Sequence, residues 1–224
     1  MKIATSIAVL ALASSTAVLA VPVVSLHASN VGISALGFSV VGNTINISET
    51  WTSNAVGVLE LSGLDLDVSY TVVKTITNNT GTNWTRIANE LLDPLDGNDG
   101  SDVLPYPGFV PAGYSTSNNN DGLSFDQGGS IARTSSAFAN VQADEVTDVR
   151  DFLDFFNGAV PNGGVFTVQF GVLDQSFAGG NQPLLLVQRP NARSVPPDVP
   201  EPGTMGLLGS GLLACAAYLG RTRR

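Results

Sequence analysis

The stretch Leu64-Asp-Leu-Asp-Val-Ser-Tyr-Thr-Val-Val-Lys-Thr-Ile76 decides the fold class, because apolar and polar side chains alternate along most of it. Only Val73 and Lys74 break the alternation. Successive side chains of a β-strand point to opposite sides, so this period of two predicts a half-buried strand. The turn-forming segment Asn78-Asn-Thr-Gly81 then predicts where the strand ends.

Similar short segments occur along most of the chain, separated by Gly and Asn. The predicted strands are 33–41, 45–51, 56–61, 84–91, 123–126, 137–141, 166–172 and 183–188. Many short strands joined by polar turns favour a mainly β fold, a single antiparallel β-sandwich of the jelly-roll or immunoglobulin-like kind. We expect this domain to cover residues 21–195.

One segment has a helical period instead. Between residues 144 and 156, apolar side chains recur at spacings of three and four, with acidic side chains on much of the opposite side. This pattern predicts a short amphipathic helix that covers one end of the sandwich and stops at Asn157-Gly158. The helix leaves Phe155 on the acidic side, for which the sequence offers no reason.

The first twenty residues have the features of a secretory signal peptide. Lys2 supplies the positive charge, residues 3–13 form a short apolar run, and small residues lead to a cleavage site after Ala20. The sequence therefore predicts export through the Sec translocon. An uncleaved membrane anchor is the alternative, and the shortness of the apolar run disfavours it.

The other end predicts a membrane anchor. Residues 196–202 form a Pro-rich spacer, residues 203–220 carry no charge, and residues 221–224 are a basic tail. Eighteen residues in a helix rise about 27 Å, enough to span a thin bilayer. Arg221, Arg223 and Arg224 should hold this terminus in the cytoplasm, which leaves the folded domain outside. A buried core helix is the alternative for 203–220.

The order Val199-Pro200-Glu201-Pro202, then a Gly- and Leu-rich span, then a basic end closely resembles the PEP-CTERM sorting signal. Such tails occur in Gram-negative bacteria that make extracellular polysaccharide. The resemblance implies processing by an exosortase, a membrane cysteine protease that cuts near Pro200, Glu201 and Pro202. It covers only the tail, and it says nothing about the type of the folded domain.

Charge limits the partners of the protein. The chain of 224 residues has a net charge of −9 and lacks the clustered Lys and Arg that nucleic-acid binding needs. Lys2 and the three terminal arginines lie outside residues 21–202, so 6 basic and all 19 acidic residues remain there, a net charge of −13. This charge favours solubility and disfavours anionic surfaces unless a cation bridges them.

Groups for catalysis are scarce. The single His, His27, lies close to the predicted signal cleavage site, and the single Cys, Cys215, lies in the predicted membrane span. A nucleophilic triad would therefore need a flexible terminus. We expect a non-enzymatic protein. A glycoside hydrolase is the less favoured alternative, since it needs two paired carboxylates beside a cleft.

The segment 93–122 is the best candidate for a binding loop, because thirty residues without regular structure exceed the usual loop length. Its first part offers oxygen ligands among glycines and could bind calcium. These residues are Asp93, Asp96, Asn98, Asp99 and Asp102. Their spacing does not match an EF-hand, and an acidic, solvated turn is the alternative. No other cofactor is expected.

Aromatic side chains offer a second kind of site. Trp84, Tyr106 and Tyr114 could act as platforms for a sugar, while burial of Trp51 and Trp84 in the core is the alternative. Together these features predict an exported protein of the cell surface or extracellular matrix, linked to exopolysaccharide or biofilm. A calcium- or carbohydrate-binding module that uses residues 93–122 is the second hypothesis.

Overall fold

The computed structural model describes residues 21–95, 110–117, 121–126, 128–144, 150–175 and 183–192. This part of the chain is mainly β, as predicted, with thirteen strands and no helix. The strands are β1 (Val23–Leu26), β2 (Ile33–Val41), β3 (Thr44–Trp51), β4 (Gly57–Ser62), β5 (Tyr70–Asn78), β6 (Trp84–Pro94), β7 (Tyr114–Thr116), β8 (Leu123–Ser124), β9 (Thr134–Ser135), β10 (Phe138–Asp144), β11 (Phe152–Val160), β12 (Val165–Asp174) and β13 (Leu184–Pro190).

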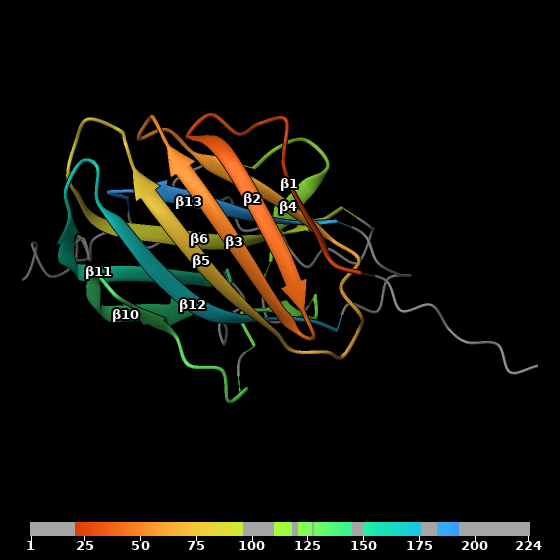
Figure 1. The fold of residues 1–224 in the computed structure, drawn as a ribbon. Coiled ribbons are helices and arrows are strands. Elements are labelled where there is room, and N and C mark those ends of the chain that lie inside the picture. Colours follow the sequence, from red (N-terminus) through yellow and green to blue (C-terminus); the bar gives the residue numbers. More distant parts are fainter. Residues whose placement is uncertain are drawn as a thin grey trace, which may run out of the picture.

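The strands form two sheets. Sheet A has the order β1-β4-β13-β6-β11-β10, with β7 paired to β6, and sheet B has the order β2-β3-β5-β12-β8, with β9 paired to β12. Figure 1 shows β2, β3, β5 and β12 as one layer in front of β4, β6 and β13. Among these strands every pair is antiparallel except β3 and β5.

The parallel pair departs from the predicted antiparallel arrangement, and the chain path explains it. Strand β4 lies between β3 and β5 in the chain but belongs to sheet A. The chain therefore crosses to the other layer, runs one strand there, and returns to sheet B in its original direction.

One hydrophobic core lies between the sheets and takes inward-facing side chains from both. Trp51 of β3 and Trp84 of β6 are fully buried and meet edge to face, with ring centroids 5.3 Å apart. Trp84 also meets Phe166 of β12 at 6.0 Å. An edge-to-face contact is favourable because the positive edge of one ring meets the negative face of the other. These contacts join the two layers. Space is tight there, because a Cβ at Gly57 would overlap the Trp51 ring.

The stretch that predicted the fold becomes a strand later than expected. Strand β5 begins at Tyr70, because Asp67 has a φ of 60°, a left-handed conformation that interrupts an extended chain. From Tyr70 onward the alternation has no break. Lys74, which interrupts the apolar pattern of the sequence, occupies a fully buried position on the inner side of the strand.

The predicted amphipathic helix over 144–156 is wrong. Strand β10 runs to Asp144, and β11 begins at Phe152 and pairs with β10 on one side and β6 on the other. Leu153 and Phe155 lie in the core, whereas Phe156 is only half-buried. Pairing on both sides overrides the local helical period, and it explains Phe155, which the helix left among acidic residues.

Each of the other predicted strand segments contains a strand, with ends that differ by a few residues. The strands that the sequence missed are β1, β7, β9 and β11. Three of them are two to four residues long, too short to display a period of two. The fourth, β11, was assigned to the helix.

Several predicted segments lie outside the described residues. They are the signal peptide 1–20, most of the loop 93–122, the spacer 196–202, the membrane span 203–220 and the basic tail 221–224. In the described part of the chain, no helix has the length and apolarity needed to cross a membrane.

Two adjacent phenylalanines test the assignment of β11. We expect Phe155→Ala to lower the free energy of unfolding by about 3–5 kcal/mol, because it empties a core position. The neighbouring Phe156→Ala should cost about 1 kcal/mol or less, because Phe156 is half-buried and stacks on Arg86 at 5.6 Å. Denaturant unfolding measures both values. Equal losses at the two positions would contradict the strand.

Candidate functional site

The outer side of sheet B carries a patch that we call the uncharged face. The strand register places sixteen outward-facing residues of β2, β3, β5 and β12 in four rows across the sheet. The rows are Val41, Thr44, Thr71 and Gly171; Ser39, Asn46, Val73 and Gln169; Gly37, Ser48, Thr75 and Thr167; and Ala35, Thr50, Thr77 and Val165.

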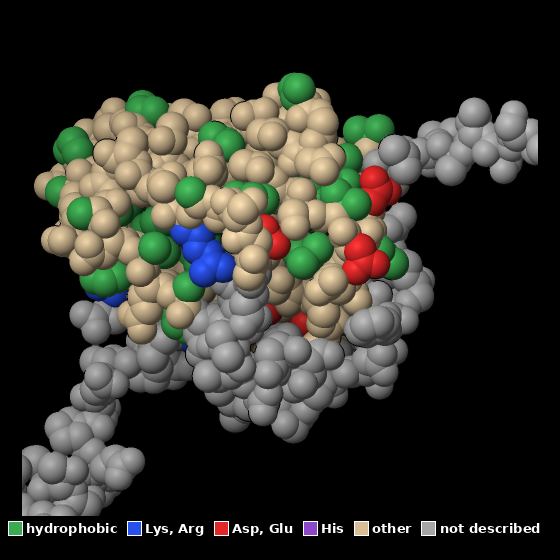
Figure 2. Space-filling view, turned by 90° about the horizontal axis from the view of Figure 1, so that it is seen from below, with side chains coloured by type: hydrophobic (Ala, Val, Ile, Leu, Met, Phe, Trp, Pro, Cys, Tyr) green, Lys and Arg blue, Asp and Glu red, His purple; other side chains and the backbone are tan. Residues whose placement is uncertain are grey.

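None of the sixteen residues is charged, and ten are Ser, Thr, Asn or Gln. This composition differs from that of the whole chain, which has 19 acidic residues. Figure 2 shows the molecule from below rather than onto this face, and the charged side chains visible there gather near the middle and right of the described surface. The uncharged face is therefore a surface of hydroxyl, amide and methyl groups.

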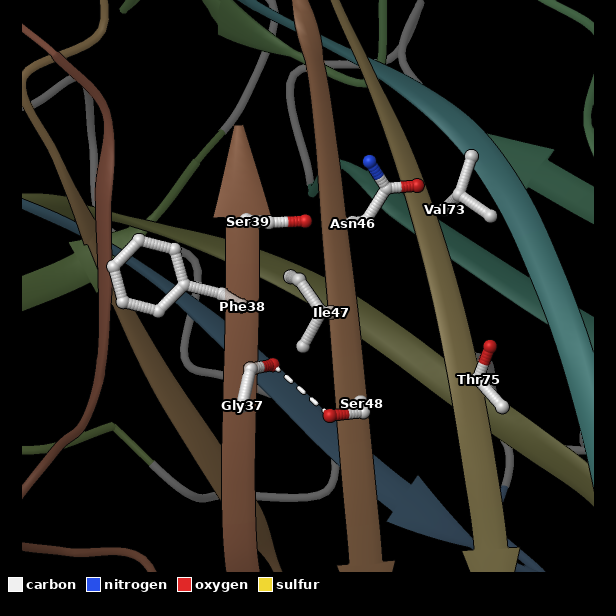
Figure 3. Close-up of a pocket in the computed structure, with 8 residues that line it drawn as sticks. All are labelled: Gly37, Phe38, Ser39, Asn46, Ile47, Ser48, Val73 and Thr75. Atoms are coloured by element: carbon white, nitrogen blue, oxygen red, sulfur yellow. Dashed lines mark hydrogen bonds between the residues drawn. The ribbon is translucent and has the colours of Figure 1, made fainter. Parts of the chain in front are cut away.

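The face is hollowed at Gly37 of β2. A shallow groove of about 380 Å³ lies there, bordered by Ser39, Asn46, Ser48 and Thr75 (Figure 3). A Cβ at Gly37 would approach the Ser48 hydroxyl to 2.7 Å. That hydroxyl donates a hydrogen bond to the Gly37 carbonyl at 3.3 Å.

A second hollow of about 270 Å³ adjoins the first and shares Gly37, Ser48 and Thr75 with it. Each hollow spans β2, β3 and β5, and the two follow one another along these strands. An open, elongated surface of this kind suits an extended chain better than a small molecule, which usually binds in a concave pocket.

The chemistry of the uncharged face is hydrogen bonding. Hydroxyl groups both donate and accept, and the amides of Asn46 and Gln169 do the same with separate atoms. The face holds no acid, base or thiol that could act in catalysis. It can therefore bind a neutral polar ligand, but the sixteen residues offer no means to transform one.

Sheet A carries a buried cluster of charged side chains. Glu90 of β6 lies 3.0 Å from Arg150 and 2.7 Å from Arg189, and all three side chains are almost fully buried. Burial raises the pKa of Glu90, and the two guanidinium groups oppose the rise. In this triad, the buried Glu90 carboxylate is thus paired with two cations inside the fold, which indicates a structural role.

The predicted calcium ligands are described only in part. Asp93 is in β6, is nearly buried and pairs in register with Ser115 of β7. Asp96, Asn98, Asp99 and Asp102 lie outside the described residues. Among the residues that the structure does describe, no three His, Cys, Asp or Glu side chains are grouped closely enough to hold a metal ion.

The predicted sugar platforms are separated. Trp84 lies in the core, where its indole N–H donates to Asn54 at 2.8 Å and Thr80 at 3.1 Å, so it presents no ring to solvent. Tyr114 is half-buried at β7 and meets the His27 ring at 5.7 Å. Burial raises the pKa of the Tyr114 hydroxyl, and nearby Glu60 raises it further. Tyr106 lies outside the described residues.

The processing residues also lie outside the described part of the chain. They are Ala20, Pro200, Glu201, Pro202, Arg221, Arg223 and Arg224.

The sequence analysis missed the uncharged face as a unit, although its parts were visible. The polar side of 44–50 and that of 71–77 are both apparent as alternating Thr, Ser and Asn. What the sequence does not display is the parallel pairing of β3 with β5, which brings these two polar rows side by side.

Comparison with known proteins identifies the tail alone. Residues 198–224 match the model of the PEP-CTERM protein-sorting motif, which confirms the resemblance of this segment. No curated protein and no solved structure matches the chain.

The Glu90 triad gives a stability prediction. We expect Glu90→Gln to lower the free energy of unfolding by about 3–5 kcal/mol, because it removes the carboxylate that contacts both buried guanidinium groups. Glu60→Gln, in the adjacent region of sheet A, is the control and should change little, since Glu60 is only half-buried. Denaturant titration of both variants gives the comparison, and a loss at Glu90 no larger than the control would refute the structural role.

Proposed function

We propose that this protein is an exported, non-enzymatic component of the cell surface or extracellular matrix, built as a β-sandwich. The match of residues 198–224 to the PEP-CTERM sorting motif carries the proposal. Such a signal implies export, a membrane-anchored precursor and processing by an exosortase.

The remaining ends of the sequence support the same route. Residues 1–20 would direct the chain to the Sec translocon, and residues 203–220 would hold the precursor in the inner membrane. Arg221, Arg223 and Arg224 would keep the tail in the cytoplasm until the exosortase cuts near Pro200, Glu201 and Pro202. The folded domain would then reach the surface or the matrix.

Two epitope tags test this route, one inserted after Val21 and one at the C-terminus. We expect the surface form to keep the first tag and lose the second, because cleavage near residues 200–202 removes the tail. Replacing Pro200, Glu201 and Pro202 with Ala should leave both tags on one membrane-bound chain. Immunoblots of cell fractions give the answer.

A surface form that retains the C-terminal tag would overturn the proposed processing. That result would not contradict the described fold, because the last described strand ends at Pro190, before the processing residues.

The uncharged face supports a second, more specific proposal, that it contacts uncharged extracellular polysaccharide. Its ten Ser, Thr, Asn and Gln side chains can hydrogen-bond sugar hydroxyls without desolvating a charge. Acidic polysaccharide fits less well, because residues 21–202 carry a net charge of −13 that repels it. In this binding mode the sugar contacts a broad polar surface and not an aromatic platform such as Trp84, which is buried.

The calcium site and the hydrolase remain weaker alternatives. The calcium hypothesis now depends on four residues outside the described part of the chain together with Asp93. A glycoside hydrolase would need a carboxylate pair in a cleft, and the groove at Gly37 is bordered by hydroxyl and amide groups.

Substitution at the centre of the face tests polysaccharide binding. We expect Thr75→Asp to weaken the binding of neutral exopolysaccharide by at least about threefold, the equivalent of one net hydrogen bond. Thr85→Asp makes the same change at an exposed position of sheet A and should leave binding unchanged. Calorimetry with neutral and acidic fractions of the producing cell's polysaccharide provides the measurement. Equal effects of the two variants would refute the role of the uncharged face.

A further inference from the structure

A cluster of polar side chains lies inside the core, between the two sheets. Glu49 of β3 and Lys74 of β5 come from sheet B, and Gln188 of β13 comes from sheet A. The exposed fractions of Glu49, Lys74 and Gln188 are 2%, 0% and 0%. Burying an amine, a carboxylate and a carboxamide together is costly unless they satisfy one another.

The contacts in this cluster converge on one oxygen of Glu49. The Lys74 Nζ lies 3.1 Å from Glu49 Oε1, and the Gln188 Nε2 donates to that same oxygen at 3.0 Å. The Lys74 Nζ also donates to the Gln188 Oε1. The other oxygen of Glu49, Oε2, accepts a hydrogen bond from the Trp51 indole at 2.9 Å, which fixes the orientation of the carboxylate.

This arrangement contains the parts of an acyl-transfer reaction. An amine contacts the carboxamide of Gln188, and one carboxylate oxygen contacts both the amine and the amide nitrogen that would leave. Burial lowers the pKa of the Lys74 amine, although the charge of Glu49 opposes this, and a lower pKa increases the fraction of the nucleophilic neutral amine. Because the fold holds the reacting groups in contact, no bimolecular encounter is needed, and the activation free energy of the reaction is lower.

We propose that Lys74 and Gln188 form an intramolecular isopeptide bond, with Glu49 as the acid–base catalyst. The Lys74 Nζ attacks the Gln188 Cδ, and a new Nζ–Cδ bond forms. Glu49 takes a proton from Nζ and delivers it to Nε2, the Cδ–Nε2 bond breaks, and one ammonia leaves. No electron is gained or lost, and the Glu49 carboxylate is regenerated.

The bond would connect the two layers of the fold directly. Lys74 and Gln188 are 114 residues apart in the chain, and they belong to different sheets. A covalent link between distant residues restricts the unfolded chain and so stabilises the folded one. A disulfide cannot do this here, because the chain has one Cys, Cys215.

Asn89 is the other carboxamide nearby, and the contacts favour Gln188 over it. Asn89 pairs in register with Gln188 and is fully buried. Its amide nitrogen donates to the Leu153 carbonyl at 3.3 Å. Only Gln188 is hydrogen-bonded to both Lys74 and Glu49 among the described carboxamides.

Tryptic mapping of the purified full-length protein tests the proposal. Apart from Lys2, Lys74 is the only lysine, so an unlinked chain gives the peptide 75–86. In a linked chain trypsin does not cut after Lys74, and the peptide that ends at Arg86 carries the peptide that contains Gln188. That second peptide is 151–193, because Pro190 prevents cleavage after Arg189. We expect the linked pair, lighter than the sum of its two parts by the mass of one ammonia.

Glu49→Gln is the informative variant, because it keeps the size of the side chain and removes the proton carrier. We expect this variant to release peptide 75–86 and unlinked 151–193. Glu60→Gln is the matched control, since it changes a glutamate outside the cluster, and it should keep the link. The wild-type digest decides the matter even if Glu49→Gln fails to fold. Free peptide 75–86 from the folded wild-type protein, or a link from Lys74 to Asn89, would overturn the proposal.

Discussion

The alternation of side chains along β3 and β5, which pair in parallel and in register, controls the chemistry of both sides of sheet B. On the inner side this register places Glu49 and Lys74 in the core. On the outer side it places Ser48 beside Thr75, and Thr50 beside Thr77, in the uncharged face. A shift of one residue in either strand would exchange the two sides and destroy both features.

The sequence predicted the mainly β class and most strands, because their alternation is a local property that any half-buried strand displays. It failed at β11, where four of the five residues from Phe152 to Phe156 are aromatic or aliphatic and the period depends on pairing with β6 and β10. It also could not reveal the partners of Lys74. That residue is a break in a local pattern, and only the meeting of β5 with β13 across the core gives it a carboxamide neighbour.

The candidate site was harder to predict than the fold for the same physical reason. Aromatic and acidic residues attract attention in a sequence, but Trp84 is needed in the core, and Glu90 is neutralised by Arg150 and Arg189. The exposed face consists instead of common residues such as Ser48 and Thr75. Their significance lies in being adjacent without an intervening charge, a property of strand order and register.

The core cluster and the uncharged face lie on opposite sides of sheet B, so a bond in the core would stabilise the sheet that carries the face. A Lys–Glu pair in an apolar core is costly, and a hydrophobic pair of similar volume is often as stable or more so. Converting the amine of Lys74 to an amide would leave a group that can no longer take up a proton in the core, joined by a bond whose formation does not depend on redox conditions. A sheet stabilised in this way could present a broad surface without needing a disulfide. The burial of a reactive amine beside a carboxamide is thus easier to explain by covalent chemistry than by stability alone.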